Sequence, residues 1–429
     1  MNIIERGRVF VQGLRAIAHR SVGDWRHCPY CGSTRTYRNG SYWRHPWTLA
    51  GRETVQIQRH CCQACGRSYA ENQAWLVRGS WYGREVHRCA VDHWVHGRTS
   101  LRRTAEFMRS WMGHQERWRK WRVWEEETER REASHLSFTT VQRWLDRAGQ
   151  KARESVPGQL EGLTSSGQMG TDGLWVRLRG GGKRVILSLV DSATGLIWAT
   201  VVVVGEESAL SWRALFERLQ EVGLAWGKLD GVTSDGAQGL LSYLRNALSG
   251  VHHQRCIWHF WRSLAADLAK AVAQATKGLA QGMGKATRRI VRQELTALLH
   301  MVIDAQNYEQ AERALTRLAA HPQGKRLAKK VNEQLDHLLF HLLDCHRGLM
   351  RVSPEWLWRD FRLRLSHGRN HGSTERFERA ALLWSIYHNF TPAQRRSERK
   401  RDYKHPGQCP LQVAGRAPGK ISYLDALAV

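Results

Sequence analysis

The chain has 429 residues, of which 66 are Lys or Arg and 39 are Asp or Glu, giving a formal net charge of +27. This length accommodates two or three domains, and the charge favours a polyanionic partner, because phosphates that bind basic side chains release condensed counterions. The longest apolar run, LIWATVVVVG, is too short to span a membrane. The basic residues 1–26 lack the apolar centre and cleavage site of a secretory signal. We therefore expect a cytoplasmic, nucleoid-associated protein without a membrane partner.

Residues 27–80 contain two Cys-x-x-Cys-Gly motifs, which predict a zinc ribbon. Four thiolates suit tetrahedral zinc, and the Gly after each pair lets the backbone bend so that N–H groups reach the sulfurs. The expected ligands of one structural Zn2+ ion are Cys28, Cys31, Cys62 and Cys65. Such a site has no open position, so we expect no catalysis there. Cys61 is expected to be a spare thiol, and His27 and His60 are alternative ligands.

Residues 84–150 predict a helix-turn-helix region that binds DNA. Apolar residues recur at helical spacing up to a glycine that ends the first helix. This apolar face consists of Val86, Ala90, Val91, Trp94 and Val95. Thr99 or Ser100 can cap the second helix, LRRTAEFM, and Thr139 or Thr140 can cap the third, which contains TVQRWL. The third would be the recognition helix.

The second and third helices are separated by a long stretch, RSWMGHQERWRKWRVWEEETERREASH, instead of a short turn. Trp118, Trp121 and Trp124 lie three residues apart in it, on one helical face. This spacing is typical of an inserted helix that packs its tryptophans, and a DNA wedge or an oligomer contact is the alternative. The expected DNA-binding side chains are Arg102, Arg103, Thr140, Gln142 and Arg143.

Residues 151–166 contain Pro, Gly and Ser and predict a linker. An α/β core is expected to begin at residue 167. Its expected elements are strands at 170–178, 184–191 and 196–204, a helix at 208–224, a strand at 229–236, a helix at 237–248, and a strand that enters a helix at 251–260. Antiparallel strands followed by helix, strand, helix and strand are the order of a ribonuclease H-like fold.

Two aspartates stand at matching places in this order. Asp172 lies in the middle of the first strand, and Asp235 lies at the end of the fourth, between Ser234 and Gly236. In a ribonuclease H-like sheet these strands are neighbours, so the two carboxylates would face each other. Paired carboxylates can bind two Mg2+ or Mn2+ ions about 4 Å apart, which activate a nucleophile at a phosphodiester. A helix N-cap is the alternative role of Asp235.

A third carboxylate is expected on the helix that begins in GSTERFERAALLW. Glu375 is the candidate, and Glu378 is the runner-up. The stretch HQRCIWHFWRSL contains Cys256 and His259, which are only two of the ligands that zinc needs. We expect this pair to support the acids through packing or hydrogen bonds, and a zinc hydrolase built on it is a distant alternative.

The expected architecture is therefore multidomain. The predicted parts are a basic segment at 1–26, a zinc ribbon at 27–80, a helix-turn-helix region at 84–150 with an inserted Trp-rich helix, a linker at 151–166, a ribonuclease H-like core at 167–264 and 356–390, an all-α insertion at 265–355, and a basic, partly disordered tail at 391–429.

Four segments of the chain resemble the Mutator-type DDE transposases of bacterial insertion sequences. They are GTDGLWVRL, VTSDGAQGL, HHQRCIWHFWRSL and GSTERFERA. The resemblance covers roughly residues 165–390, and the helical insertion matches the one expected between the second Asp and the Glu. The family often has Asn three residues before the Glu, where this chain has Gly372.

The resemblance implies a transposase whose N-terminal modules recognise terminal inverted repeats and whose basic insertion grips double-stranded DNA. Asp172, Asp235 and Glu375 would hold Mg2+ for strand cleavage by water, and the freed 3′-hydroxyl would attack target DNA. The assembly would be at least dimeric, because two element ends must be paired. The alternatives are a structure-specific nuclease or resolvase, which does not join strands, and a transposase-derived DNA-binding regulator without catalysis.

Overall fold

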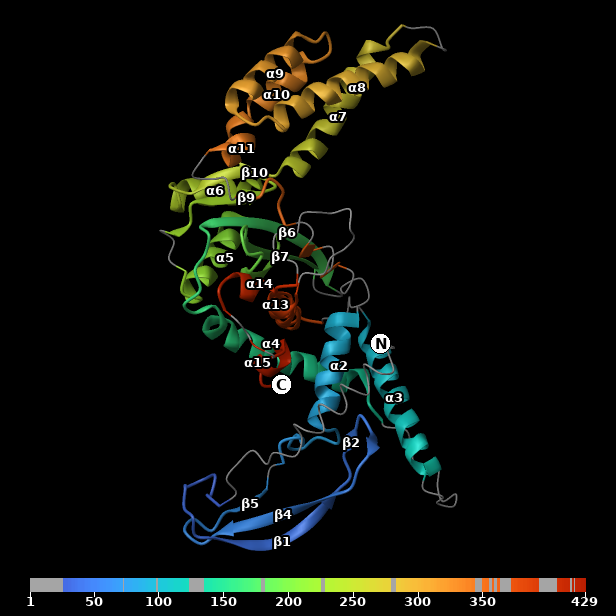
Figure 1. The fold of residues 1–429 in the computed structure, drawn as a ribbon, viewed down its shortest axis with the longest axis vertical. Helices are drawn as coiled ribbons and strands as arrows, with labels where there is room; N and C mark the ends of the chain where they lie inside the picture. The colour runs from blue at the N-terminus through green and yellow to red at the C-terminus, as the bar shows by residue number, and fades with distance from the viewer. Residues whose placement is uncertain are drawn as a thin grey trace. The chain divides into compact units, whose positions relative to one another are not determined.

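The computed structural model describes much of the chain from residue 26 onward (Figure 1). The described residues are 26–429 without 72, 98, 123–134, 179–181, 225–227, 279–282, 344–348, 355–356, 359–360, 363–371, 393–406, 417–418 and 420; for 114–122 and 283 only the backbone is described. These residues form two compact units. One holds the described residues up to Lys151 together with Leu424–Val429, and the other holds those from Ala152 to Tyr423. Within these ranges, no helix is long and apolar enough to cross a membrane.

The first unit contains two small antiparallel sheets. The first sheet has three strands in the order β1-β4-β5: β1 (Thr36–Arg44), β4 (Val55–Cys62) and β5 (Ser68–Ala70). The second sheet has two strands, β2 (Trp47–Thr48) and β3 (Gly51–Arg52). Thr36 at the start of β1 pairs with Cys62 at the end of β4. The sheet therefore brings the second cysteine pair to the same end as the loop that holds Cys28 and Cys31.

Helices follow in the first unit: α2 (Arg84–Gly97), α3 (Leu101–Arg122) and the start of α4 (Phe138–Leu160). All of the predicted apolar positions of α2 are buried. Ser100 caps α3, because its Oγ accepts a hydrogen bond from the N–H of Arg103 at 3.3 Å. Ser137 caps α4 in the same way, accepting from Thr140 at 3.2 Å. The predicted caps Thr139 and Thr140 are therefore wrong: both already lie inside the helix.

The stretch expected as a separate inserted helix begins as a continuation of α3, which runs without a break to Arg122. Its Arg, Lys, Gln and Glu side chains are strong helix formers, and they extend the helix that precedes them. Trp118 and Trp121 lie on this helix, in the part whose side chains are not described, and Trp124 lies outside the described residues. The role of these tryptophans stays a prediction.

The expected linker also differs from the structure, because α4 continues through Pro157 to Leu160. Proline removes one N–H from a helix, but here the helix ends one turn later, so few backbone bonds depend on it. Leu160 is buried in the main core cluster, with Val156 packed against the same cluster. The Pro and Gly content alone predicts an irregular segment here, but the burial of Leu160 keeps these residues helical.

The second unit is built on a five-stranded mixed sheet with the order β10-β9-β6-β7-β8. The strands are β6 (Gln168–Leu178), β7 (Gly182–Asp191), β8 (Ile197–Val204), β9 (Gly231–Ser234) and β10 (His252–Arg255). β6, β7 and β8 are joined as antiparallel neighbours, whereas β9 is parallel to β6 and β10 is parallel to β9. The order and approximate bounds of these elements agree with those predicted, and the first and fourth strands of the set are neighbours.

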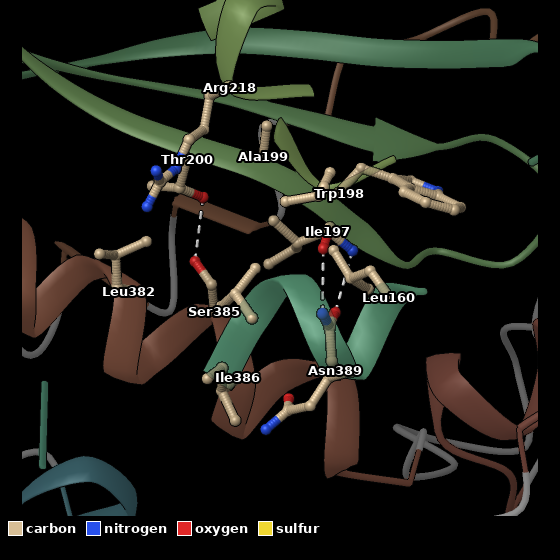
Figure 2. Close-up of a pocket in the computed structure, with 13 residues that line it drawn as sticks. Leu160, Ile197, Trp198, Ala199, Thr200, Arg218, Leu382, Ser385, Ile386 and Asn389 are labelled. Atoms are coloured by element: carbon tan, nitrogen blue, oxygen red, sulfur yellow. Dashed lines mark hydrogen bonds between the residues drawn. The ribbon is translucent and has the colours of Figure 1, made fainter. Parts of the chain in front are cut away.

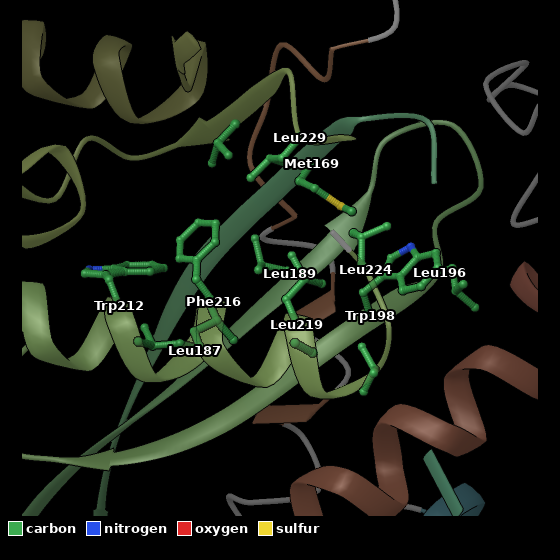
Figure 3. Close-up of a cluster of buried hydrophobic side chains, with 14 of the residues drawn as sticks. Met169, Leu187, Leu189, Leu196, Trp198, Trp212, Phe216, Leu219, Leu224 and Leu229 are labelled. Atoms are coloured by element: carbon green, nitrogen blue, oxygen red, sulfur yellow. The ribbon is translucent and has the colours of Figure 1, made fainter. Parts of the chain in front are cut away.

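Helices α5 (Ala209–Glu221) and α6 (Gln238–Ala247) pack against one face of this sheet. Figure 3 shows Trp212, Phe216 and Leu219 of α5 directed at Met169 and Leu189 of the sheet. All of these side chains are almost fully buried. Burying an aliphatic or aromatic side chain contributes about 1.5–3 kcal/mol, so this cluster contributes strongly to the stability of the second unit.

The helix α13 (Thr374–Phe390) packs against β8 from the other face. Figure 2 shows how it is fixed: the hydroxyls of Ser385 and Thr200 lie 3.0 Å apart, and the Asn389 side-chain amide bonds to both the N–H and the C=O of Ile197. Because β8 is an edge strand, Asn389 satisfies backbone groups that face away from β7. The small pocket between these elements has a volume of about 20 Å³.

A helical segment lies between β10 and α13. It contains α7 (Ile257–Ala275), α8 (Met283–Ile303), α9 (Tyr308–Ala320), α10 (Lys325–Asn332), α11 (Leu335–Leu339) and the 3-10 turn η2 (Phe340–Leu342), which share a second buried apolar cluster. The segment returns to the sheet at β10, where the Gln254 side chain donates to Leu338 O at 2.9 Å and accepts from the His341 N–H at 3.0 Å. Helix α7 crosses the predicted boundary at 264/265 without a break.

Short helices α14 (Pro410–Val413) and α15 (Tyr423–Ala426) occur in the predicted C-terminal tail. Cys409 and Leu411 are each 1% exposed and belong to the main core cluster. This part of the tail is therefore ordered, because an apolar Cys-Pro-Leu sequence interrupts the basic stretch and is buried.

Candidate metal and acid sites

The four predicted zinc ligands come together. The Sγ atoms of Cys28 and Cys65 are 3.7 Å apart, and those of Cys31 and Cys62 are 3.6 Å apart. All four Sγ atoms lie within 4.8 Å of one another, which is the spacing of sulfurs around a tetrahedral ion at about 2.3 Å. Among the described residues, these cysteines are the one group of three or more His, Cys, Asp or Glu side chains placed to hold a metal ion.

Matching backbone turns position the two cysteine pairs. The N–H of Gly32 donates to Cys28 O at 2.8 Å, and the N–H of Gly66 donates to Cys62 O at 2.9 Å. Both glycines have a φ near +70°, a conformation that other residues rarely adopt. The glycines thus close the turns, while the N–H groups that reach the Cys62 sulfur belong to Cys65 and Ala64.

These N–H groups also favour the metal-binding form of Cys62. The backbone hydrogen bond from Cys65, opposed by burial and helped by Ala64, lowers the pKa of the Cys62 thiol to about 6. A thiolate is the form that binds zinc. Of the alternative ligands, His60 has another partner, since its Nε2 lies 3.0 Å from Glu71 Oε1. Cys61 is outside the group, as predicted for a spare thiol.

The two predicted aspartates stand at one level of the larger sheet. β6 and β9 are paired in parallel up to Gly170 and Thr233. Two residues further along each chain are Asp172 and Asp235, so continuing this register sets the aspartates opposite each other. Asp172 is buried and Asp235 is half-buried.

Asp172 lies on the face of the sheet away from α5 and α6. Met169 and Val232 face the core under α5 and α6. Gly170 instead faces Met350, and the Thr233 hydroxyl donates to Met350 O at 2.6 Å. Side chains alternate along a strand, so Asp172, two residues after Gly170 within β6, lies on the face away from α5. Asp235 directly follows Ser234, the last residue of β9, and stands at the level of Asp172 in the turn that leads to α6.

Asp235 is not the N-cap of α6. The cap is Ala237, which makes no side-chain capping bond. Asp235 Oδ1 instead accepts a hydrogen bond from the Ala237 N–H at 2.9 Å, and Gly236 between them has a φ of +79°. The Asp235 carboxylate therefore lies at the start of the turn between β9 and α6, where the Ala237 N–H fixes one of its two oxygens.

Glu375 lies in the first turn of α13 and is exposed, whereas Glu378 is half-buried. Thr374 beside Glu375 accepts a hydrogen bond from Arg184 Nε at 2.7 Å. Arg184 pairs with Val176, four residues along β6 from Asp172, which corresponds to about 13 Å at 3.3 Å per residue. Within the described residues, the structure does not gather the three predicted carboxylates into one ligand group.

Two charged side chains beside Asp235 were missed at the level of sequence. Glu207, in the turn between β8 and α5, is half-buried. Its partial burial and then the Asp235 charge raise its pKa to about 7, against a hydrogen bond from Trp175. Arg255, the last residue of β10, interacts electrostatically with Asp235 and occupies the space beside Gly236. Gly173 was the available signal in the sequence, because a glycine inside a strand often marks a place where another group approaches the backbone closely. It could not identify that group as Glu207.

Cys256 and His259 link the start of α7 to the chain that returns from the insertion. Cys256 Sγ accepts a hydrogen bond from the Ser353 N–H at 3.2 Å, and Ser353 Oγ lies 3.4 Å from His259 Nδ1. Burial raises the pKa of the Cys256 thiol, but hydrogen bonds from His259 and Ser353 outweigh it and bring the pKa to about 7. Cys256 N–H also donates to Ser234 O at 2.7 Å, next to Asp235.

The predicted DNA-binding side chains lie at the start of α3 and α4. Arg102, Arg103 and Arg143 are exposed, and the Arg102 guanidinium stacks over the Phe138 ring at 5.3 Å. Gln142 donates to Asp146 Oδ1 at 3.0 Å. The hydroxyl of Thr140 lies 3.0 Å from that of Ser137. The three arginines are thus available to a phosphate backbone, and the two polar side chains have local partners.

Comparison with known proteins gives one consistent result. Residues 169–345 match the family described as "Transposase, Mutator family". Two similar curated proteins are both described as "Transposase for insertion sequence element IS256 in transposon Tn4001", one from Staphylococcus aureus and one from Enterococcus faecalis (strain ATCC 700802 / V583). Each is 33% identical over 106 residues, which are 24% of this chain and 27% of the relative. The match thus spans about a quarter of the length of these relatives.

Proposed function

We propose that this chain is a DNA transposase with a DDE acid triad, because residues 169–345 match the Mutator family of transposases and 106 residues are similar to IS256 transposases. It would bind terminal inverted repeats, cleave a DNA strand with water, and join the freed 3′-hydroxyl to target DNA. The observation that supports the proposal is the position of Asp172 and Asp235 at one level of the sheet, each two residues beyond the last paired residue of two adjacent parallel strands. The strand order β10-β9-β6-β7-β8 supports a ribonuclease H-like core.

The acid site fits Mg2+ or Mn2+ in the chemistry of its donors. Carboxylate oxygens are the ligands that these hard cations take, and both aspartates stand beside glycines, Gly173 and Gly236, that let other charged side chains approach closely. Two bound ions would activate the attacking oxygen and stabilise the leaving one. The residues proposed to hold them are Asp172, Asp235 and Glu375. Glu375, in the first turn of α13, is the proposed third ligand.

The remaining parts of the chain are proposed to bind DNA and to assemble the transposase on it. The net charge of +27 supports a polyanionic partner, and the exposed arginines of α3 and α4 support contact by the helix-turn-helix region. The four-cysteine group supports a structural zinc ribbon. A transposase must pair two element ends, so we propose an assembly that is at least dimeric.

Strand transfer by the full-length protein tests this function. Duplexes that carry the element ends would be incubated with Mg2+ and a supercoiled target, with Asp172→Asn, Asp235→Asn and Glu375→Gln assayed beside the wild type. Glu378→Gln is the matched control on the same helix. We expect joined product from the wild type and from Glu378→Gln, and none from the other three variants.

Other outcomes would change the conclusion. Loss of joining in Glu378→Gln but not in Glu375→Gln would transfer the third role to Glu378. Cleavage without joining would indicate a nuclease or resolvase. Specific DNA binding with neither reaction would indicate a regulator derived from a transposase.

A further inference from the structure

Gly173 follows Asp172 on β6, and its missing side chain makes room for Glu207. A Cβ at Gly173 would clash with the carboxylate of Glu207. Gly173 lies within a regular strand, paired with Leu187, so no special backbone angle explains the glycine. The space itself explains it, because glycine in a strand allows another group to approach the backbone closely.

A second glycine holds Glu207 from the other side. A Cβ at Gly239, in the first turn of α6, would clash with the backbone carbonyl of Glu207. The next residue, Ser208, caps α5 by accepting a hydrogen bond from the Ser211 N–H at 3.2 Å. Glu207 is therefore held between β6, α5 and α6: its carboxylate lies against Gly173, and its backbone lies against Gly239.

The contacts of Glu207 place it close to both aspartates. Its carboxylate lies against Gly173, the residue after Asp172, and its backbone carbonyl lies against Gly239, four residues after Asp235. Carboxylates gathered in one place repel one another unless a proton or a cation lies with them. Arg255 is placed over Gly236, where it interacts with Asp235.

We propose that Glu207 is a further carboxylate of the acid site and binds a divalent cation together with Asp235. Glu207 comes from the α5 face, in phase with Gly173, whereas Asp172 lies on the opposite face. Glu207 would therefore bind the cation from the α5 side of the sheet, where the Asp172 side chain does not extend. The inference rests on the proposed function for the identity of the cation, Mg2+ or Mn2+.

Calorimetric titration of the full-length chain with Mn2+, in the absence of DNA, tests the inference. Glu207→Gln keeps the shape of the side chain and removes its charge, and we expect it to raise the Kd for Mn2+ by roughly tenfold or more, as loss of an interaction at a metal site does. Glu206→Gln is the matched control, because Glu206 is adjacent and exposed. It should leave the Kd unchanged.

A second variant separates metal binding from folding. Gly173→Ala keeps the charge of Glu207 but displaces its carboxylate, so it should also weaken Mn2+ binding. The melting temperature without metal ion shows whether either variant is folded. Glu207→Asp, which retains a carboxylate, should bind Mn2+ more tightly than Glu207→Gln.

The outcomes distinguish this inference from the proposed function. If Asp235→Asn weakens Mn2+ binding and Glu207→Gln does not, the inference is wrong and the proposed function stands. If the wild type binds no Mn2+, or binds it equally well with Asp235→Asn, both are overturned. Parallel loss in Glu207→Gln and Gly173→Ala, with Glu206→Gln unaffected, supports Glu207 as a ligand.

Discussion

The guanidinium of Arg255 fills the space that a side chain at Gly236 would need. Gly236 has a φ of +79° and directly follows Asp235. Arg255 is held there by its position at the end of β10, whose register against β9 pairs it with Ser234. The turn that presents Asp235 thus depends both on the freedom of a glycine and on a cation from the neighbouring strand.

We expect Gly236→Ala to lower stability and to displace Arg255. A non-glycine residue in this conformation costs about 1–2 kcal/mol, and the clash with Arg255 adds to that cost. Gly195→Ala is the control, because Gly195 has a φ of +70° and open space around it. Chemical denaturation should show a larger loss for Gly236→Ala. Equal losses would mean that Arg255 moves away without cost.

Asn389→Ala should destabilise the second unit by about 1–3 kcal/mol, the cost of leaving buried backbone groups without partners. Asn389 is buried and bonds to both backbone groups of Ile197. Ser385→Ala should cost less, since the Thr200 hydroxyl keeps its contact with Ser188 at 2.9 Å. Urea denaturation followed by circular dichroism measures both. A smaller effect for Asn389→Ala than for Ser385→Ala would contradict this account.

Replacing a cysteine of the four-cysteine group should release its metal. Purified wild-type protein is expected to contain about one zinc ion per chain, and Cys62→Ser to contain almost none, because a structural site needs all its thiolates. Cys61→Ser is the control, since Cys61 is adjacent but outside the group. Zinc content by mass spectrometry decides the matter. Zinc loss in Cys61→Ser, or its retention in Cys62→Ser, would refute this ligand assignment.

Acid should destabilise the second unit through His253. Burial, with the nearby charges of His337 and Arg255, lowers the pKa of His253 to about 3. Above its ordinary pKa of 6.5 the ring is neutral in both states, and the contribution of His253 to stability is complete. As pH falls below 6.5, His253 is protonated in the unfolded chain but stays neutral in the folded chain. The free energy of unfolding therefore declines until about pH 3.

The measurement is the free energy of unfolding between about pH 7 and pH 5. We expect a shallower decline in His253→Gln than in the wild type. The matched control is His96→Gln, because His96 is exposed on α2, and it should leave the slope unchanged. An unchanged slope in His253→Gln would show that His253 is not the group that titrates.

Much of the fold follows from patterns within short stretches. The apolar face of α2, the strand bounds of the larger sheet and the two cysteine pairs depend on local periodicity and spacing, and the structure confirms them. The prediction that Asp172 and Asp235 lie at one level of the sheet needs one further assumption, that the first and fourth strands are neighbours. The roles of these acids, and of Glu375, stay predictions.

The features that could not be predicted depend on packing between distant segments. Helix α4 passes Pro157 because Leu160 is buried in a core that forms only in the folded unit. Glu207 lies in VVGEESAL, which is indistinguishable from an ordinary polar turn before a helix. Only the contacts with Gly173 and Gly239, 34 and 32 residues away, set it beside Asp235.

The bond between Asn389 and Ile197 has a consequence for synthesis on the ribosome. The two residues are 192 positions apart, so β8 leaves the ribosome long before its partner on α13 exists. During that interval the outer edge of the strand offers unpaired N–H and C=O groups, which are a template for pairing with another chain. Contacts of such long range also form slowly. The nascent protein is therefore most exposed to aggregation while the helical segment between β10 and α13 is being made.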